Sequence, residues 1–438
     1  MALLLAAAVA LPATSSAEAP LLTLGQAIEI ALVHSHRLGA ADASIGEAEA
    51  RVDEARSGRL PRVGLDAGYS RTDSPTRVFS YKLDQGVFAA DDFDVSRLND
   101  PDPLSDVRGV ASVYQPIYSG GAIRSGIDAA AAERDAATAL RERSRQEVVE
   151  HVIVAYTDAV LTRHQLDVAR ESFETARANV RLVADLRDAG LVVESDLLQA
   201  RVRETEVLEL VAASESAVEL ARAEVNLALG RDLGTAFVAG ESLDAPPPAD
   251  DGLDQLIAAA LETRPDLRAG RERLRSSEQS VRSAMADQRP TLGVTGVAQA
   301  HSDEPFGSYG SDWAVSVDAR FTVFDGNRAS ARVRQAAERL RRAQSEHELL
   351  RQTIDLEVRR GFHDRLTARK RLVQTEAAIG MAQESLRIVR DRYREGLTTL
   401  VELLDAESRL TGARTRDVAA RRELLLAQAR LDLAIGIL

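Results

Sequence analysis

Two stretches of this chain, Gly190-Leu-Val-Val-Glu-Ser-Asp-Leu-Leu-Gln-Ala200 and Gly396-Leu-Thr-Thr-Leu-Val-Glu-Leu-Leu-Asp-Ala406, repeat one pattern. The offset between them also relates Gly120, Asp158 and Leu227 to Gly326, Asp364 and Leu433. A second, slightly larger offset relates Leu24, Pro61 and Gly64 to Leu253, Pro290 and Gly293. Chance matching of Ala and Leu does not place Gly, Pro and Asp in unbroken register, so the chain is an internal duplication.

The duplication predicts four segments. Residues 1–19 are a short apolar run followed by small residues, typical of a signal peptide, with an ordinary N-terminal core helix as the alternative. Residues 20–240 are the first repeat and residues 253–438 the second, each with two strands and a helical hairpin. Residues 241–252 are a proline-rich linker. Because the two offsets differ, the first repeat carries extra chain between Gly64 and Gly120.

The longest segments have the period of helices. Residues 24–57 carry apolar side chains at helical spacing, and residues 121–189 contain no Pro and, after the opening Gly121, only one Gly. The second segment permits one helix of roughly 100 Å. Gly190 ends it, Ser195 is the expected N-cap of the return helix, and residues 327–435 repeat this design. Narrow apolar stripes on such helices must pack against other helices as in coiled coils.

Between the helices the period changes to two. Trp313, Val315, Val317 and Phe321 alternate with Ala314, Ser316, Asp318 and Thr322, which predicts a strand with one apolar face. This pattern fits a soluble sheet or a membrane barrel with lipid outside. The strands have the length that spans a bilayer, no run of about 18 apolar residues offers a membrane helix, and four strands cannot close alone. We therefore expect a barrel shared between chains.

Composition excludes several classes of function. The net charge of −13 comes without a separate basic run, so a nucleic-acid partner is not expected. The absence of Cys excludes disulfides, thiol nucleophiles and a lipidated N-terminal Cys. The seven His are scattered, and no nucleophile elbow or phosphate loop occurs. The sequence therefore predicts neither a metal site nor a cofactor, and no enzyme.

Several short motifs, in order and duplicated, resemble the TolC family of outer-membrane efflux ducts. They are the Leu-x-x-Ala-Ile-x-x-Ala-Leu opening at residues 24–32, the strand entry at residues 60–61, the turns at residues 116–121 and 323–326, and the segments 396–399 and 402–406. The resemblance implies a mainly α fold with a membrane β-barrel portion. A homotrimer would close a twelve-stranded β-barrel in outer-membrane lipid and continue it into a long periplasmic α-helical barrel.

The resemblance also implies the function and the sites. The protein would be a passive exit duct of a tripartite efflux or secretion system, opened when a periplasmic adaptor and an inner-membrane pump dock. Glu402 and Asp405 match the family's acidic constriction, and Tyr393 matches a gate tyrosine. The docking tips would be Gly190, Leu191, Gly396, Leu397, Thr398 and Thr399. Thr398 stands where some members carry a basic residue.

Two alternatives remain at this level. Glu402 and Asp405, as plain residues at spacing i,i+3, also fit a solvated helix face. A periplasmic coiled-coil adaptor or structural protein also fits the long helices, although such a protein would carry one hairpin rather than two.

Overall fold

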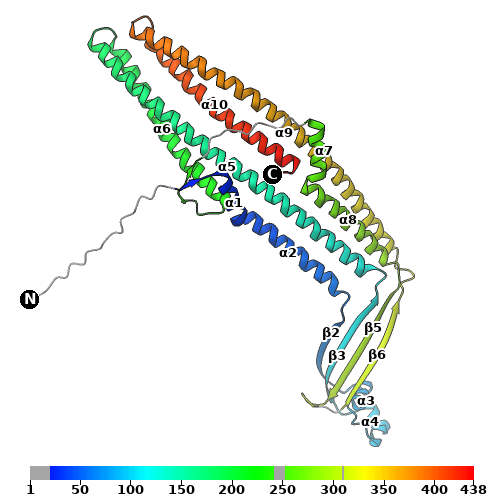
Figure 1. Ribbon diagram of the computed structural model, residues 1–438. Coiled ribbons are helices and arrows are strands. Elements are labelled where there is room, and N and C mark those ends of the chain that lie inside the picture. The colour runs from blue at the N-terminus through cyan, green and yellow to red at the C-terminus, as the bar shows by residue number, and fades with distance from the viewer. Residues whose placement is uncertain (1–19, 241–251, 308–309) are drawn as a thin grey trace, which may run out of the picture. The chain divides into compact units, whose positions relative to one another are not determined.

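The computed structural model describes residues 20–240, 252–307 and 310–438 (Figure 1). The predicted signal peptide, residues 1–19, and all of the predicted linker except Gly252 lie outside the described residues. The chain forms two compact units. Of the described residues, one unit, here the helical unit, holds 20–40, 142–240, 252–265 and 352–438. The other, here the sheet unit, holds 41–141, 266–307 and 310–351.

Four long helices dominate the fold. Helices α5 (Ala122–Asp188) and α9 (Arg328–Arg394) have 67 residues each, and α6 (Glu194–Leu229) and α10 (Leu400–Ile435) have 36. Within each pair the bounds are shifted by the offset that separates Gly190 from Gly396. These glycines follow α5 and α9 with φ of +74° and +73°, a backbone conformation that favours glycine. No helix in the described ranges is both long and apolar enough to cross a membrane.

The segment with helical spacing over residues 24–57 forms two helices and not one, because the chain breaks at Ser35. Helix α1 (Leu24–His34) ends there and α2 (His36–Ser57) begins. The second repeat breaks at the matching position, Arg264, between α7 (Leu253–Thr263) and α8 (Pro265–Ala286). Pro265 explains that break, since a residue before proline avoids the helical conformation, and Arg264 is extended with ψ of 124°.

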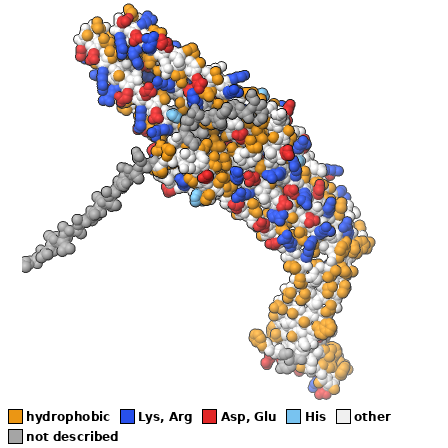
Figure 2. All heavy atoms as spheres, in the orientation of Figure 1, with side chains coloured by type: hydrophobic (Ala, Val, Ile, Leu, Met, Phe, Trp, Pro, Cys, Tyr) orange, Lys and Arg blue, Asp and Glu red, His pale blue; other side chains and the backbone are white. Residues whose placement is uncertain are grey.

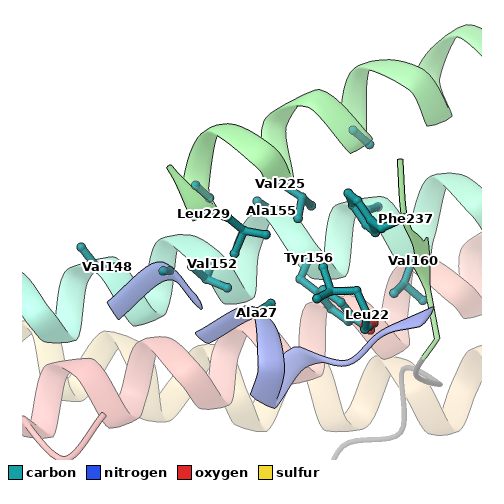
Figure 3. Close-up of a cluster of buried hydrophobic side chains, with 14 of the residues drawn as sticks. Leu22, Ala27, Val148, Val152, Ala155, Tyr156, Val160, Val225, Leu229 and Phe237 are labelled. Carbon is teal, nitrogen blue, oxygen red and sulfur yellow. The ribbon is translucent and has the colours of Figure 1, made fainter. Parts of the chain in front are cut away.

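The core of the first hairpin lies where α1, α5 and α6 meet (Figure 3). Ala27, Val152 and Leu229 lie in this cluster. The Tyr156 hydroxyl donates a 2.7 Å hydrogen bond to the Leu22 carbonyl, which fixes the chain before α1. Here two short parallel strands, β1 (Leu21–Leu22) and β4 (Val238–Ala239), add to the four expected.

The expected strands form one antiparallel sheet in the order β2-β3-β5-β6. Their bounds are β2 Arg62–Thr72, β3 Leu104–Tyr118, β5 Thr291–Ser302 and β6 Gly310–Arg320. The extra chain of the first repeat folds between β2 and β3 as α3 (Pro75–Asp84), η1 (Ala90–Phe93) and α4 (Val95–Asn99). Because β2 and β6 stand at the two ends of the strand order, they are the two edges of the sheet. Phe321, predicted on the strand, lies just beyond the end of β6.

Candidate functional site

The two hairpin tips lie together at one end of the helical unit (Figure 1). Gly190 and Leu191 connect α5 to α6, and residues 396–399 connect α9 to α10. Leu191 is 72% exposed and Leu397 is 61% exposed. Below the tips, side chains from all four long helices form one apolar cluster, which includes Val183, Leu197, Leu386 and Leu403. The tips thus present exposed leucines on a packed four-helix base.

The two tips are capped differently. Thr399 is the N-cap of α10, and its hydroxyl accepts from the Glu402 backbone N–H at 3.4 Å. The Thr398 hydroxyl donates to the Glu402 carboxylate. In the first tip the N-cap is Val193, without a side-chain bond, so the expected capping role of Ser195 is wrong. The N-cap of the second tip is therefore held by a side-chain hydrogen bond, and that of the first tip is not.

Glu402 and Asp405 lie on the exposed side of α10. Three positions separate them, so both carboxylates lie on one helix face. Asp405 pairs with Arg409 at 2.8 Å, an exposed i,i+4 pair. The structure therefore brings the two predicted constriction residues together as an acidic stripe near the tip.

Tyr393 lies away from these carboxylates, inside the apolar tip cluster. Its side chain is buried, at 5% exposure, and its hydroxyl has no hydrogen-bond partner within the described residues. Burial raises the pKa of Tyr393, and the charge of Asp196 adds to the effect. A buried polar atom without a partner is unfavourable, so the Tyr393 hydroxyl is a destabilising feature of the tip cluster.

A polar network that the sequence did not reveal connects the two hairpins below the tips. Asn179 on α5 donates to both carboxylate oxygens of Glu407 on α10, each at 2.8 Å. Arg390 on α9 reaches the same carboxylate at 3.4 Å. Asn179 is 6% exposed, so its amide depends on this partner. The sequence signal that could have indicated this network is Asn179 itself, a polar residue at a position of α5 where the helical spacing places apolar contact residues.

The sheet has one apolar face that runs across all four strands. The register pairs Val63 with Val113, Val113 with Gly296, and Gly296 with Val315, so these residues share a face. On the edge strand β6, the exposed fractions of Trp313, Val315 and Val317 are 77%, 64% and 67%. Phe321, past the strand end, is 58% exposed. Hydrophobic side chains accordingly cover much of the sheet surface in Figure 2.

The opposite face of the sheet is polar. Ser316 pairs with Thr295, which in turn pairs with Tyr114. Gln299 and Asp312 also pair, with 3.3 Å between their side chains. The alternation predicted for one strand thus holds for the whole sheet, which separates an exposed apolar surface from a hydrophilic one.

No group of three or more His, Asp or Glu side chains that could hold a metal ion occurs in the described part of the chain. The candidate features are surfaces, namely the tips, the acidic stripe of α10 and the two-faced sheet.

Comparison with known proteins identifies the class. The family model for the outer membrane efflux protein matches residues 27–231 and 256–437, so the chain belongs to this family. Its fold is that of the family's channels: the CmeC outer membrane channel of Campylobacter jejuni matches with a TM-score of 0.81 at 17% identity, covering 100% of this chain and 93% of that one. The protein is an outer-membrane channel protein, which removes the adaptor alternative.

Two relatives cover nearly the whole sequence. The chain is 27% identical over 419 residues to Protein CyaE of Bordetella pertussis, covering 95% of this chain and 84% of that protein. It is 28% identical over 442 residues to the pyoverdine export outer membrane protein OpmQ of Pseudomonas putida, covering 94% and 85%.

Proposed function

We propose that this protein is the passive exit duct of a tripartite efflux or secretion system. The observation that carries the proposal is the sheet, which combines an exposed apolar face, a polar face and two edge strands, β2 and β6, that pair on one side only within the described residues. In lipid, an edge strand with unsatisfied backbone groups is strongly unfavourable. Copies of the same chain supply the missing partners when β6 of one copy pairs with β2 of the next.

Three copies are the number that the family resemblance implies, giving a closed ring of twelve strands. The exposed apolar face then contacts outer-membrane lipid, and the polar face lines a water-filled interior. Strands of 11 to 15 residues are long enough for an apolar band of about 25 Å. The long helices form the periplasmic part of the duct. Transport through it needs no energy source in this chain.

The acidic stripe of α10 is proposed as the periplasmic constriction. Three copies of Glu402 and Asp405 would form two stacked rings of carboxylates, which select for cations. Tyr393 would act from inside the tip cluster, where its hydroxyl gains a partner when the tips rearrange. The hydrogen bond from the Thr398 hydroxyl would hold the Glu402 carboxylate in place without the basic residue that the family resemblance places at this position in some members.

The hairpin tips are proposed as the docking surface of the periplasmic adaptor, which connects the duct to an inner-membrane pump. Leu191 and Leu397 are exposed apolar side chains at these tips, as are the neighbouring Val193 and Val401. The relative OpmQ is named for pyoverdine export, which supports an export role and leaves the cargo of this chain open.

Cell fractionation combined with crosslinking tests the proposal. The chain should sediment with outer membranes and run as a trimer on SDS gels without heating. A photo-crosslinking residue at Leu191 or Leu397 should capture an adaptor, whereas one at Leu220, similarly exposed at 67% but far from the tip on α6, should not. A freely soluble periplasmic monomer would refute the duct, and equal capture at Leu220 would refute docking at the tips.

A further inference from the structure

The sheet unit contains a large pocket where strands give way to helices. It has a volume of about 930 Å³ and is bounded by the end of β3, the first turns of α5 and the last turns of α8. Four guanidinium groups line it, from Arg59, Arg124, Arg282 and Arg289, against a single carboxylate, Asp128. The pocket is therefore strongly cationic in a chain whose net charge is −13.

These arginines differ from most others on the helices. Arg134 and Arg332 of the same unit pair with Asp135 and Asp287 at 2.6 and 2.7 Å. None of the four pocket arginines forms an ion pair within the described ranges of the chain. A concentration of guanidinium groups without carboxylate partners favours an anionic ligand, because it leaves the charge and the hydrogen-bond donors available.

The backbone at the pocket is held in a fixed arrangement. Gly120 and Gly121 have φ of +64° and +100°, and a Cβ on Gly120 would come within 2.7 Å of the Ala286 carbonyl oxygen. The Arg289 guanidinium donates to the Gly120 carbonyl at 3.1 Å. The glycine turn thus joins the start of α5 to the end of α8, and it positions Arg289 at the pocket wall.

The rim of the pocket is apolar and continues into the apolar face of the sheet. Ile117, Tyr118 and Met285 line the pocket and are 58%, 47% and 41% exposed. Tyr118 pairs with Leu292, which lies two positions from Val294 on β5, and Val294 pairs with Val317 of β6. An amphiphilic anion would therefore find charge inside the pocket and an apolar surface beside it.

We propose that this pocket binds a phosphate group, carried by the headgroup of an anionic phospholipid or by a free phosphate anion. The planar guanidinium matches the geometry of phosphate oxygens through paired hydrogen bonds. The apolar rim favours the lipid. That choice rests on the proposed function, since only a sheet in the bilayer brings a headgroup to this position, whereas binding of free phosphate does not depend on it.

The test uses the purified full-length protein in neutral detergent. Native mass spectrometry counts bound phosphatidylglycerol and bound phosphatidylcholine of the same acyl length, and calorimetry measures inorganic phosphate. The double variant Arg124→Gln with Arg282→Gln removes two charges from the pocket. The matched control, Arg273→Gln with Arg339→Gln, removes two charges from positions of α8 and α9 outside it.

We expect the pocket variant to bind phosphatidylglycerol about 25-fold more weakly than the parent, because each of the two arginines contributes a factor of about five, and we expect the control to match the parent. Arg282→Lys keeps the charge but loses the planar fork, so it should weaken binding several-fold and provides a milder variant for a pocket that tolerates little change.

The outcomes separate the two sources of phosphate. If the parent prefers phosphatidylglycerol over phosphatidylcholine and the pocket variant loses this preference, the ligand is a lipid headgroup. If the parent shows no lipid preference but binds inorganic phosphate, and the pocket variant binds it more weakly than the control does, the ligand is a free anion. Equal binding by the pocket variant and the control in every arm would overturn the proposal. Outer-membrane fractionation of the same variants reports separately on the duct, because none of these changes lies on the apolar sheet face.

Discussion

Replacing Val315 with Arg tests which face of the sheet contacts lipid. Val315 lies at the centre of β6, five positions from each end of the 11-residue strand. At about 3.4 Å per residue and a tilt of about 40°, this places it about 13 Å from each end along the bilayer normal, at the middle of a band of about 25 Å. It is 64% exposed on the apolar face.

An Arg at the bilayer midplane of a membrane sheet costs about 2–4 kcal/mol in folding free energy. Three copies in the proposed trimer would therefore lose about 6–12 kcal/mol. Val317→Arg, two positions nearer the strand end, should cost less, because the penalty falls to about 0–1 kcal/mol near the interface. The matched control is Ser316→Arg, which lies on the polar face beside Asp318 and should cost within about 0.5 kcal/mol.

The assay is urea unfolding in phosphatidylcholine vesicles, followed by tryptophan fluorescence. Trp313 is the only tryptophan of the chain and shares the apolar face of β6 with Val315, so its emission reports directly on this surface. The midpoint should fall in the order Ser316→Arg, Val317→Arg, Val315→Arg, with the last the lowest. A lower midpoint for Ser316→Arg than for Val315→Arg would mean that the two faces are reversed.

Three further predictions concern the helices. Leu403→Ala, at a fully buried position of the tip cluster, should lower the unfolding free energy by about 2–5 kcal/mol, whereas Val401→Ala, 62% exposed, should change it little in the same denaturation experiment. Asn179→Ala should lower the unfolding free energy by about 1–3 kcal/mol, because it removes a hydrogen-bond donor from the Glu407 carboxylate. A decrease no larger than that caused by the same substitution at an exposed Asn would contradict the network. Burial, and then nearby arginine charge, lowers the pKa of His347 below its ordinary value of about 6.5. Below that pH the unfolded chain binds a proton at His347 more readily than the folded chain does, so the folded state loses stability as the pH falls. The melting temperature of the parent should therefore fall relative to that of His347→Gln between pH 7.5 and pH 5, and parallel curves would refute this.

The long elements were predictable because their signals are local and repeated. Gly190 and Gly396 each follow the last residue of a 67-residue helix by two positions, as the glycine signal predicts. The alternation around Val315 predicts both the strand and its faces. The duplication strengthens each of these signals, because every one of these long elements occurs twice at a fixed offset.

The remaining features depend on contacts between segments far apart in the chain. No proline follows Ser35, so the sequence does not indicate the helix break there. Only the matching break in the second repeat has a local signal, because Pro265 follows Arg264. Strands β1 and β4 are two residues long, too short to show a period. The partnership of Asn179 with Glu407 joins helices from the two different repeats. Such pairings follow from how the hairpins pack, which the sequence pattern does not specify.

The most direct test of the central claim is the conductance of the purified full-length protein in a planar lipid bilayer. A duct with carboxylate rings at its constriction should give small, cation-selective current steps that trivalent cations block from one side only. The double variant Glu402→Ala with Asp405→Ala should raise the conductance and abolish the block, because it removes both the charge and the bulk of exposed side chains. Inserted protein without current steps would contradict the duct, and unchanged selectivity and block in the double variant would contradict the proposed constriction.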